Sequence, residues 1–176
     1  MVTSYFLAYG LAGLFLFSLP DKWGRWKTMA VFGSIHVVCQ FTILLVPSYT
    51  VRTLAFAGMG ACQLKNSTSF CWLFDMVESK HKSTVCGFIN SFDMLTLSVI
   101  AFYFMFISHH WFVLFLAMTT LGGLSLVFLL FCVPESPKWL LIRQKNPQDA
   151  INSFNRIAKF NGSKTCIPEN AVFIEC

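Results

Sequence analysis

Lys65 and Asp93 are two charged residues that lie inside long apolar stretches of this 176-residue sequence. A charge at the centre of a bilayer costs about 2.5 to 3.5 kcal/mol on insertion scales, so charges kept there usually serve a function. Each of the two lies nine residues from the nearer end of its stretch, which is roughly 14 Å of helix. Consecutive antiparallel helices would therefore place both charges at the same depth.

We predict that Lys65 and Asp93 form a buried ion pair or jointly line a polar cavity, helped by Gln63 and Asn66. Opposite charges attract strongly where water is excluded. Two alternatives stay open at this stage. In one, Lys65 reaches towards the near interface while Asp93 is protonated, and in the other both contact a substrate directly. Candidate cavity residues are thus Gln63, Lys65, Asn66 and Asp93.

Other residue types that could do chemistry point to neither an enzyme nor a metal site. His109 and His110 are adjacent, and no further histidine or acid is near enough in sequence to complete a zinc set. The seven cysteines show no CxxC spacing, so we expect neither disulfides nor metal binding. We therefore expect no enzymatic activity and no cofactor.

The composition identifies the solvent in which these residues act. Apolar residues make up 56% of the chain and charged residues 12%, against about 45–50% and about 25% in soluble domains. Twenty phenylalanines and a mean hydropathy of +0.63 also exclude a disordered chain. These values favour a membrane protein.

Five apolar runs predict an all-α, polytopic membrane helix bundle. Each run is long enough to cross about 30 Å of hydrocarbon when flanking residues join in. The expected transmembrane bundle occupies residues 1–133, followed by a cytoplasmic helical segment at 134–162 and a tail at 163–176. The expected helices cover about 4–20, 28–47, 52–74, 84–107 and 110–133.

Basic residues set the expected orientation, because Lys and Arg in short loops favour the cytoplasmic side. They follow the first, third and fifth runs, whereas Arg52 lies at the opposite face. We therefore expect the N-terminus outside or in a lumen and the C-terminus in the cytoplasm, in a membrane that the sequence does not specify. Because topology explains the net charge of +5, we expect no nucleic-acid partner. The basic residues on the expected cytoplasmic side are Lys22, Arg25, Lys27, Lys80, Lys82, Lys138, Arg143, Lys145, Arg156, Lys159 and Lys164.

The turn at residues 21–27, Asp-Lys-Trp-Gly-Arg-Trp-Lys, resembles the loop between the second and third helices of the major facilitator superfamily. That loop reads G-x-x-x-D-R/K-x-G-R-K/R, and Asp21, Lys22, Gly24 and Arg25 match it. Phe17 replaces the leading glycine, and Trp26 displaces the following basic residue to Lys27.

Later motifs are similar to the same family in the expected order. Arg52 precedes Gly58 and Gly60, as in the R-x-x-x-G-x-G-x-G of the fourth helix, and Asp75 and Lys82 keep the charges of E-x6-R. Residues 134–140, Pro-Glu-Ser-Pro-Lys-Trp-Leu, resemble the P-E-S-P-R-W-L of sugar porters and organic cation transporters. Residues 150–162 resemble a stretch of the organic cation and carnitine transporter branch. The chain thus resembles helices two to six of such a transporter.

The resemblance implies transport by alternating access, with a small organic ion or a sugar-like solute as substrate. It also implies charge pairs at the cytoplasmic ends of the helices that form in one state and break in another. Expected partners are the lipid bilayer, a small-molecule solute if the transporter is complete, and a missing second half or other membrane subunits. Candidate residues of this cytoplasmic gating network are Asp21, Gly24, Arg25, Asp75, Glu78, Lys82, Glu135 and Lys138.

Three readings of the chain follow from different classes of function. It is a fragment of a solute transporter, a half-transporter that assembles with another half, or a non-transporting structural or accessory subunit of a larger membrane complex. The first is our working hypothesis. A longer transcript would favour it, whereas a stable complex with unrelated membrane proteins would favour the third.

Cap residues predict two helices within 134–162. Ser136 with Pro137, and Asn146 with Pro147, are typical N-cap and N1 pairs. In the second helix, an apolar stripe suits packing against the base of the membrane domain, although an exposed amphipathic tail is the alternative. The stripe consists of Ile151, Phe154, Ile157 and Ala158.

Overall fold

The computed structural model describes residues 1–144, 147–160, 162 and 168 and contains only helices and their connections there. This confirms the predicted all-α class. The longer helices are α1 (Val2–Leu16), α3 (Arg25–Leu45), α4 (Tyr49–Ala61), α5 (Leu64–Met76), α6 (Lys82–Phe102), α7 (Trp111–Cys132) and α9 (Pro147–Phe160). Short elements are α2 (Leu19–Trp23), a 3₁₀ turn (Ser79–His81), α8 (Pro137–Trp139) and π-helical turns at Tyr103–Ile107 and Leu140–Gln144.

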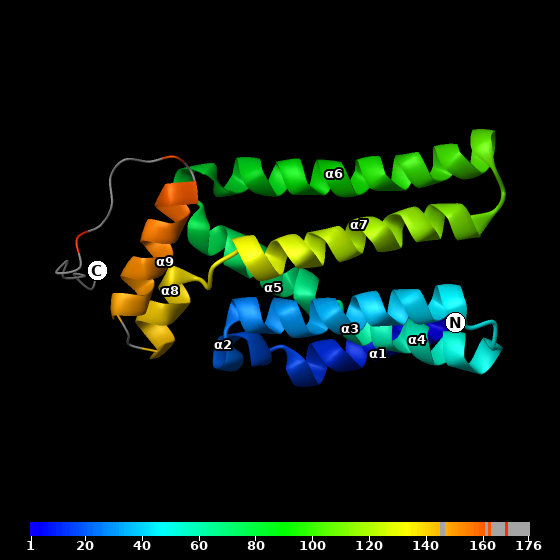
Figure 1. Ribbon diagram of the computed structural model, residues 1–176, viewed down its shortest axis with the longest axis horizontal. Coiled ribbons are helices and arrows are strands. Elements are labelled where there is room, and N and C mark those ends of the chain that lie inside the picture. Colours follow the sequence, from blue (N-terminus) through cyan, green and yellow to red (C-terminus); the bar gives the residue numbers. More distant parts are fainter. Residues whose placement is uncertain (145–146, 161, 163–167, 169–176) are drawn as a thin grey trace.

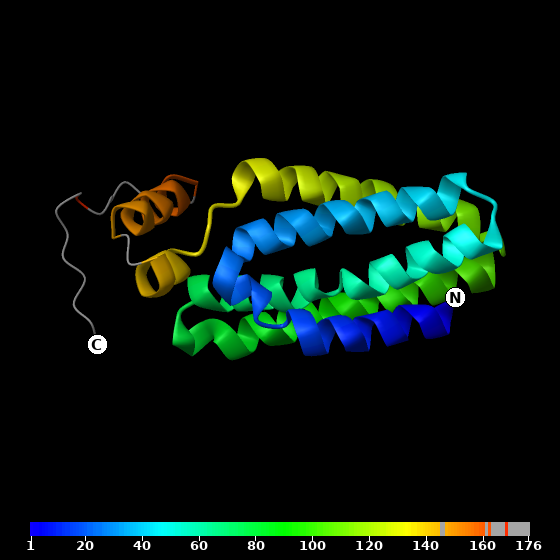
Figure 2. The same cartoon turned by 90° about the horizontal axis from the view of Figure 1, so that it is seen from below.

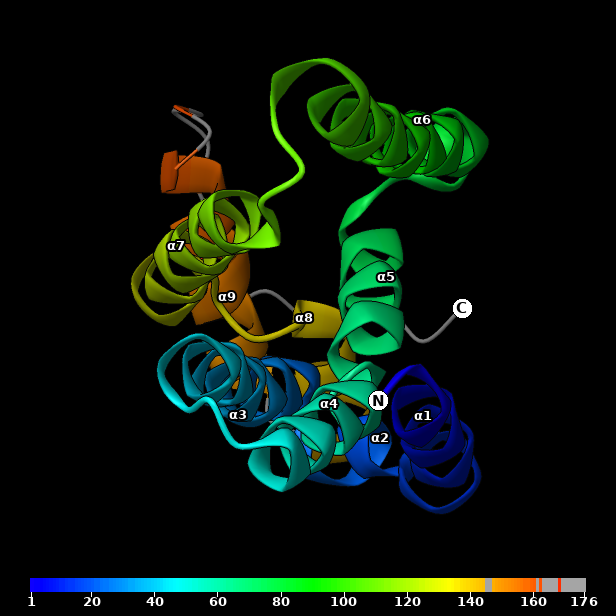
Figure 3. The same ribbon diagram turned by 90° about the vertical axis from the view of Figure 1, so that its right-hand side faces the viewer.

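The long helices run along the longest axis of the molecule (Figure 1), and Figure 3 shows them end on. The connections that follow α1, α5 and α7 all lie at one end, together with α8 and α9, and the N-terminus lies towards the other end (Figures 1 and 2). We call the end with α2, α8 and α9 the basic end, because the basic turns at residues 22–27 and 80–82 lie there. The basic turns therefore share one end of the bundle.

Three helical stretches are long and apolar enough to cross a membrane: Arg25–Leu45, Ser79–Ile107 and Trp111–Cys132. The helix α1 is apolar but shorter. The outer surfaces of α6 and α7 expose large side chains such as Phe92 and Phe131, which are 58% and 73% accessible. Burial of such side chains in lipid removes a cost that water would impose.

The third expected helix, 52–74, is wrong as a single element, because the structure divides it into α4 and α5. At the break, Gln63 and Lys65 donate main-chain hydrogen bonds to residues three positions back, Gly60 and Cys62, instead of four. Glycine in a helix interior costs about 0.5–1 kcal/mol relative to alanine. A glycine pair therefore weakens the helix just before the point where it turns.

The first expected helix, 4–20, is also interrupted. α1 ends at Leu16, and Pro20 stands in the first turn of α2. Proline cannot donate to the preceding turn of a helix, but it fits the first turn of a new one. The expected segment 134–162 contains the short α8, a π-helical turn and the longer α9, and Asn146 of its second predicted cap lies outside the described residues.

Close contact between α1 and α4 holds one side of the bundle together. An added Cβ on Gly60 would collide with the main-chain carbonyl of Tyr5. Small residues at helix contacts let backbones approach in membranes, where packing is the main attraction. Beside this contact, Ile43, Ala55 and Met59 form a buried apolar cluster between α3 and α4.

Gly60→Ala should therefore destabilise the bundle. The new methyl group forces α1 away from α4, which costs about 2 kcal/mol and lowers the melting temperature by about 5 °C. Tryptophan fluorescence during heating of the detergent-solubilised chain measures this. Gly123→Ala is the matched control, because no atom lies within 4 Å of its added Cβ. Equal melting temperatures for the two variants would contradict the tight contact.

Candidate functional site

An ion pair between Arg25 and Asp75 joins α3 to α5 at the basic end. Arg25 lies at the start of α3 and also donates to the carbonyl oxygen of Cys71 at 2.7 Å. The carboxylate of Asp75 is only 8% exposed. Pairs shielded from solvent in this way are screened less by salt than surface pairs.

Asp75 also binds the segment that follows α7. Ser136 donates its hydroxyl hydrogen bond to the carboxylate at 2.8 Å, and the Lys138 ammonium lies 3.9 Å from the other oxygen. One carboxylate on α5 thus contacts two parts of the chain that are far away in sequence, the start of α3 and residues 136–138.

Glu135 caps the N-terminus of α3. A single carboxylate oxygen accepts hydrogen bonds from the main-chain N–H groups of Arg25 at 3.0 Å, Trp26 at 2.9 Å and Ser136 at 3.1 Å. The first N–H groups of a helix have no partner within the helix, and its positive N-terminal end favours an anion. Glu135 therefore satisfies groups on α3 from the far side of the sequence.

Gly24 makes room for this contact. It adopts a φ of 106°, and a Cβ there would lie 2.6 Å from the second carboxylate oxygen of Glu135 and 3.3 Å from the Trp139 ring. A side chain would strain the backbone and also displace the carboxylate. Both effects require glycine at this position.

Three tryptophans make hydrogen bonds between elements at the basic end: Trp139 joins α8 to α2, Trp26 joins α3 to α7, and Trp72 joins α5 to the segment after α7. The indole N–H of Trp139 donates to the carbonyl of Asp21 at 2.9 Å. Those of Trp26 and Trp72 donate to the carbonyls of Leu129 and Pro134 at 3.2 and 3.1 Å. The predicted cap of α8 is confirmed, since the Ser136 hydroxyl oxygen accepts a hydrogen bond from the main-chain N–H of Trp139 at 3.3 Å.

We define the basic-end network as Arg25, Asp75, Glu135, Ser136 and Lys138. Among the other residues predicted for gating, Gly24 and Asp21 take part through their backbones. Glu78 instead lies 3.8 Å from His81 at an exposed site. Lys82 begins α6 beyond the 3₁₀ turn and has no ion pair among the described residues.

Reasoning from charge missed the uncharged members of this site. Ser136 and the three tryptophans carry no charge, yet they supply much of its hydrogen bonding. A signal was present, since a serine before Pro137 and a tryptophan three residues later in the chain fit a capped helical turn.

Lys65 and Asp93 do not form the predicted ion pair. Lys65 lines a pocket of about 270 Å³ bordered by α3, α5 and α7, and Asp93 lines one of about 250 Å³ between α5 and α6. Asn66 and Ser69 line both pockets. Equal depth does not fix the rotation of each helix about its axis. Here Lys65 of α5 lies towards α3 and α7, whereas Asp93 of α6 lies towards α5.

Gln63 lies where α4 turns into α5. Its amide donates to the Tyr5 hydroxyl, and the Asn66 amide donates to its carbonyl oxygen at 2.7 Å. Gln63 therefore links α1 to the break between α4 and α5, whereas Asn66 continues to the two pockets.

The fold and site define an integral, multi-pass membrane protein whose helices are joined by a polar network at one end. The sequence profile of the Major Facilitator Superfamily matches residues 1–166. This chain belongs to that family.

Similar curated proteins carry transporter names. The chain is 29% identical over 164 residues to Solute carrier family 22 member 4 of Mus musculus, covering 92% of the chain and 29% of the relative. It is 28% identical to Organic cation/carnitine transporter 2 of Rattus norvegicus, over 92% of the chain and 29% of that protein. It is 29% identical to Organic cation transporter-like protein of Drosophila melanogaster, over 90% of the chain and 28% of that protein. The chain spans less than a third of these relatives.

Glu135→Ala should loosen the start of α3. It removes the acceptor of three N–H groups, and bonds to a charged acceptor contribute about 1.5–3 kcal/mol. Amide hydrogen exchange at Arg25 and Trp26 should accelerate by about tenfold or more. Glu78→Ala is the control, because its side chain is 77% exposed and an exposed pair contributes little. Unchanged protection in Glu135→Ala would refute the cap.

Proposed function

We propose that this chain forms part of a solute transporter that works by alternating access, and that the basic-end network stabilises one of its conformations. Membership of the family supports the first statement. The convergence of α3, α5 and the segment after α7 on the Asp75 carboxylate carries the second.

The network has the properties that a conformational latch needs. Single exposed pairs contribute only about 0.2 to 1 kcal/mol, so one pair cannot hold a state. Here a carboxylate with little solvent contact has an arginine, a hydroxyl and a lysine as neighbours. Breaking these contacts together strands a charge, which gives two states a clear difference in free energy.

In this proposal the basic end faces the cytoplasm, with the N-terminus outside or in a lumen. The positive-inside rule supports that orientation. The latch would then close the bundle on the cytoplasmic side.

We propose a small organic ion as the substrate class. The names of two relatives contain the words organic cation. In this chain, the carboxylate of Asp93 could attract a cation. Asp93 is exposed, lines a pocket with Asn66 and Ser69, and has no ion pair within the described part of the chain. An unpaired carboxylate at membrane depth attracts a cation where water is scarce.

Arg25→Glu should lower transport without preventing insertion. The variant places an acid beside Asp75 and removes its main partner, so one conformation loses its stabilisation. The assay uses a chimera in which residues 1–166 replace the matching segment of the rat relative, with labelled organic cation uptake as the readout. We expect a loss of about tenfold or more at equal surface abundance. Lys80→Glu, exposed and at the same end, is the matched control.

The combination of Arg25→Glu with Asp75→Arg restores an opposite pair and should recover part of the uptake. Uptake that is unaltered in the single variant would refute the latch. A chimera that reaches the surface but transports nothing would contradict the transporter proposal and favour an accessory subunit.

Asp93→Asn should reduce organic cation uptake in the same chimera by about tenfold, because a neutral amide attracts a cation less. Surface abundance and the response to Arg25→Glu should not change. Ser98→Ala, another exposed position on α6, is the control. Full cation uptake by Asp93→Asn would refute the substrate class and leave the latch intact.

A further inference from the structure

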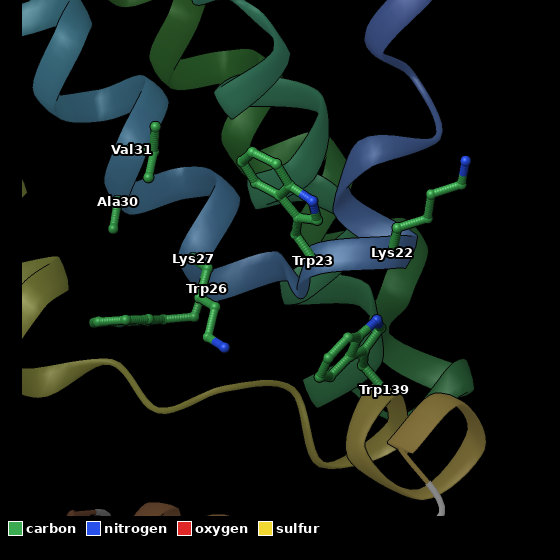
Figure 4. Close-up of a pocket in the computed structure, with 7 residues that line it drawn as sticks. All are labelled: Lys22, Trp23, Trp26, Lys27, Ala30, Val31 and Trp139. Atoms are coloured by element: carbon green, nitrogen blue, oxygen red, sulfur yellow. The ribbon is translucent and has the colours of Figure 1, made fainter.

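A pocket of about 550 Å³ lies at the basic end, outside the polar core of the network. It is bordered by α2, the first turns of α3 and the end of α8 (Figure 4). Its lining combines two lysines, three tryptophans and two small apolar residues: Lys22, Lys27, Trp23, Trp26, Trp139, Ala30 and Val31.

The lysines at this pocket are available to an anion. Lys22 and Lys27 are both exposed, and neither has an ion pair among the described residues. Figure 4 shows their ammonium groups pointing in different directions. Because a lysine stem has four flexible carbons, each group can turn towards one bound phosphate.

The tryptophans divide into two fixed rings and one with a free donor. Trp26 and Trp139 use their N–H groups for carbonyls of Leu129 and Asp21. Trp23 is 53% exposed, and its N–H has no hydrogen bond to a described residue. Indole rings with one apolar and one polar edge favour the level of lipid headgroups.

An apolar path leads from the pocket along α3 towards the other end of the molecule. Val31, Ile35, Val38 and Leu45 are all large and exposed, and their spacing places them on one helix face. From Val31 to Leu45 this face is roughly 21 Å long, which exceeds half of a hydrocarbon core of about 30 Å. The face is therefore long enough for an acyl chain to lie along it.

We propose that this pocket binds the headgroup of an anionic phospholipid, with one acyl chain along the exposed face of α3. Lys22, Lys27 and the Trp23 N–H contact the phosphate, and the rings of Trp26 and Trp139 cover the glycerol region. The apolar face of α3 favours a lipid over a free phosphate, because only a lipid has an acyl chain that can lie against it. The proposal does not depend on transport.

Lipid exchange measured by tryptophan quenching tests the site. The chain is reconstituted in phosphatidylcholine nanodiscs that contain a small fraction of either brominated phosphatidylglycerol or brominated phosphatidylcholine. We expect the anionic lipid to quench with about tenfold higher apparent affinity. Lys22→Gln with Lys27→Gln should abolish that preference. Lys80→Gln with Lys159→Gln removes two exposed charges elsewhere in the described chain and should keep it.

Val31→Phe separates shape from charge, because it obstructs the apolar wall and keeps both lysines. It should lower the preference at least severalfold, and it tests the site even if the double lysine variant does not fold. Retention of the preference in Val31→Phe, or equal loss in both double variants, would overturn the proposal. Full competition by millimolar glycerol phosphate would also overturn it, in favour of a free phosphate site.

Discussion

The carboxylate of Asp75 is a charge that must find its partners inside the protein. It has little contact with solvent, and an unpaired charge in such a place costs several kcal/mol. Arg25, Ser136 and Lys138 meet this need from the start of α3, the residue before α8 and α8 itself. These contacts fix the end of α5 against the start of α3 and the residues around α8.

The Glu135 carboxylate joins the start of α3 to the residues before α8 through main-chain hydrogen bonds. Glu135 binds main-chain groups of α3, and this contact depends on the absence of a side chain at Gly24. The indole N–H groups of Trp139 and Trp72 add hydrogen bonds to the main-chain carbonyls of Asp21 and Pro134. Charge neutralisation and backbone satisfaction therefore support the same docked position of the residues around α8.

The order of the helices and the end at which each connection lies could be predicted from the sequence, because hydropathy and the placement of charges determine them. The bilayer demands long apolar helices, and the alternating placement of basic turns brings Arg25 and Asp75 to one end before any contact is known. Features that depend on the rotation of a helix about its axis or on local backbone geometry could not be predicted. The turn at Cys62 and Gln63, the different facing of Lys65 and Asp93, and the role of Ser136 all depend on how neighbouring helices pack.

The break between α4 and α5 also bears on how the proposed latch would reach the pockets. α5 is a separate rod of 13 residues, with Asp75 near one end and Asn66 near the other, roughly 14 Å away. Asn66 lines both the Lys65 pocket and the Asp93 pocket. A rigid helix moves both of its ends together, so release of Asp75 would shift Asn66 against α6 and α7. Within the proposed transporter, an unbroken helix over 52–74 would instead tie that motion to all of α4 and its tight contact with α1. The break thus separates α4, which packs tightly on α1, from the helix that carries Asp75.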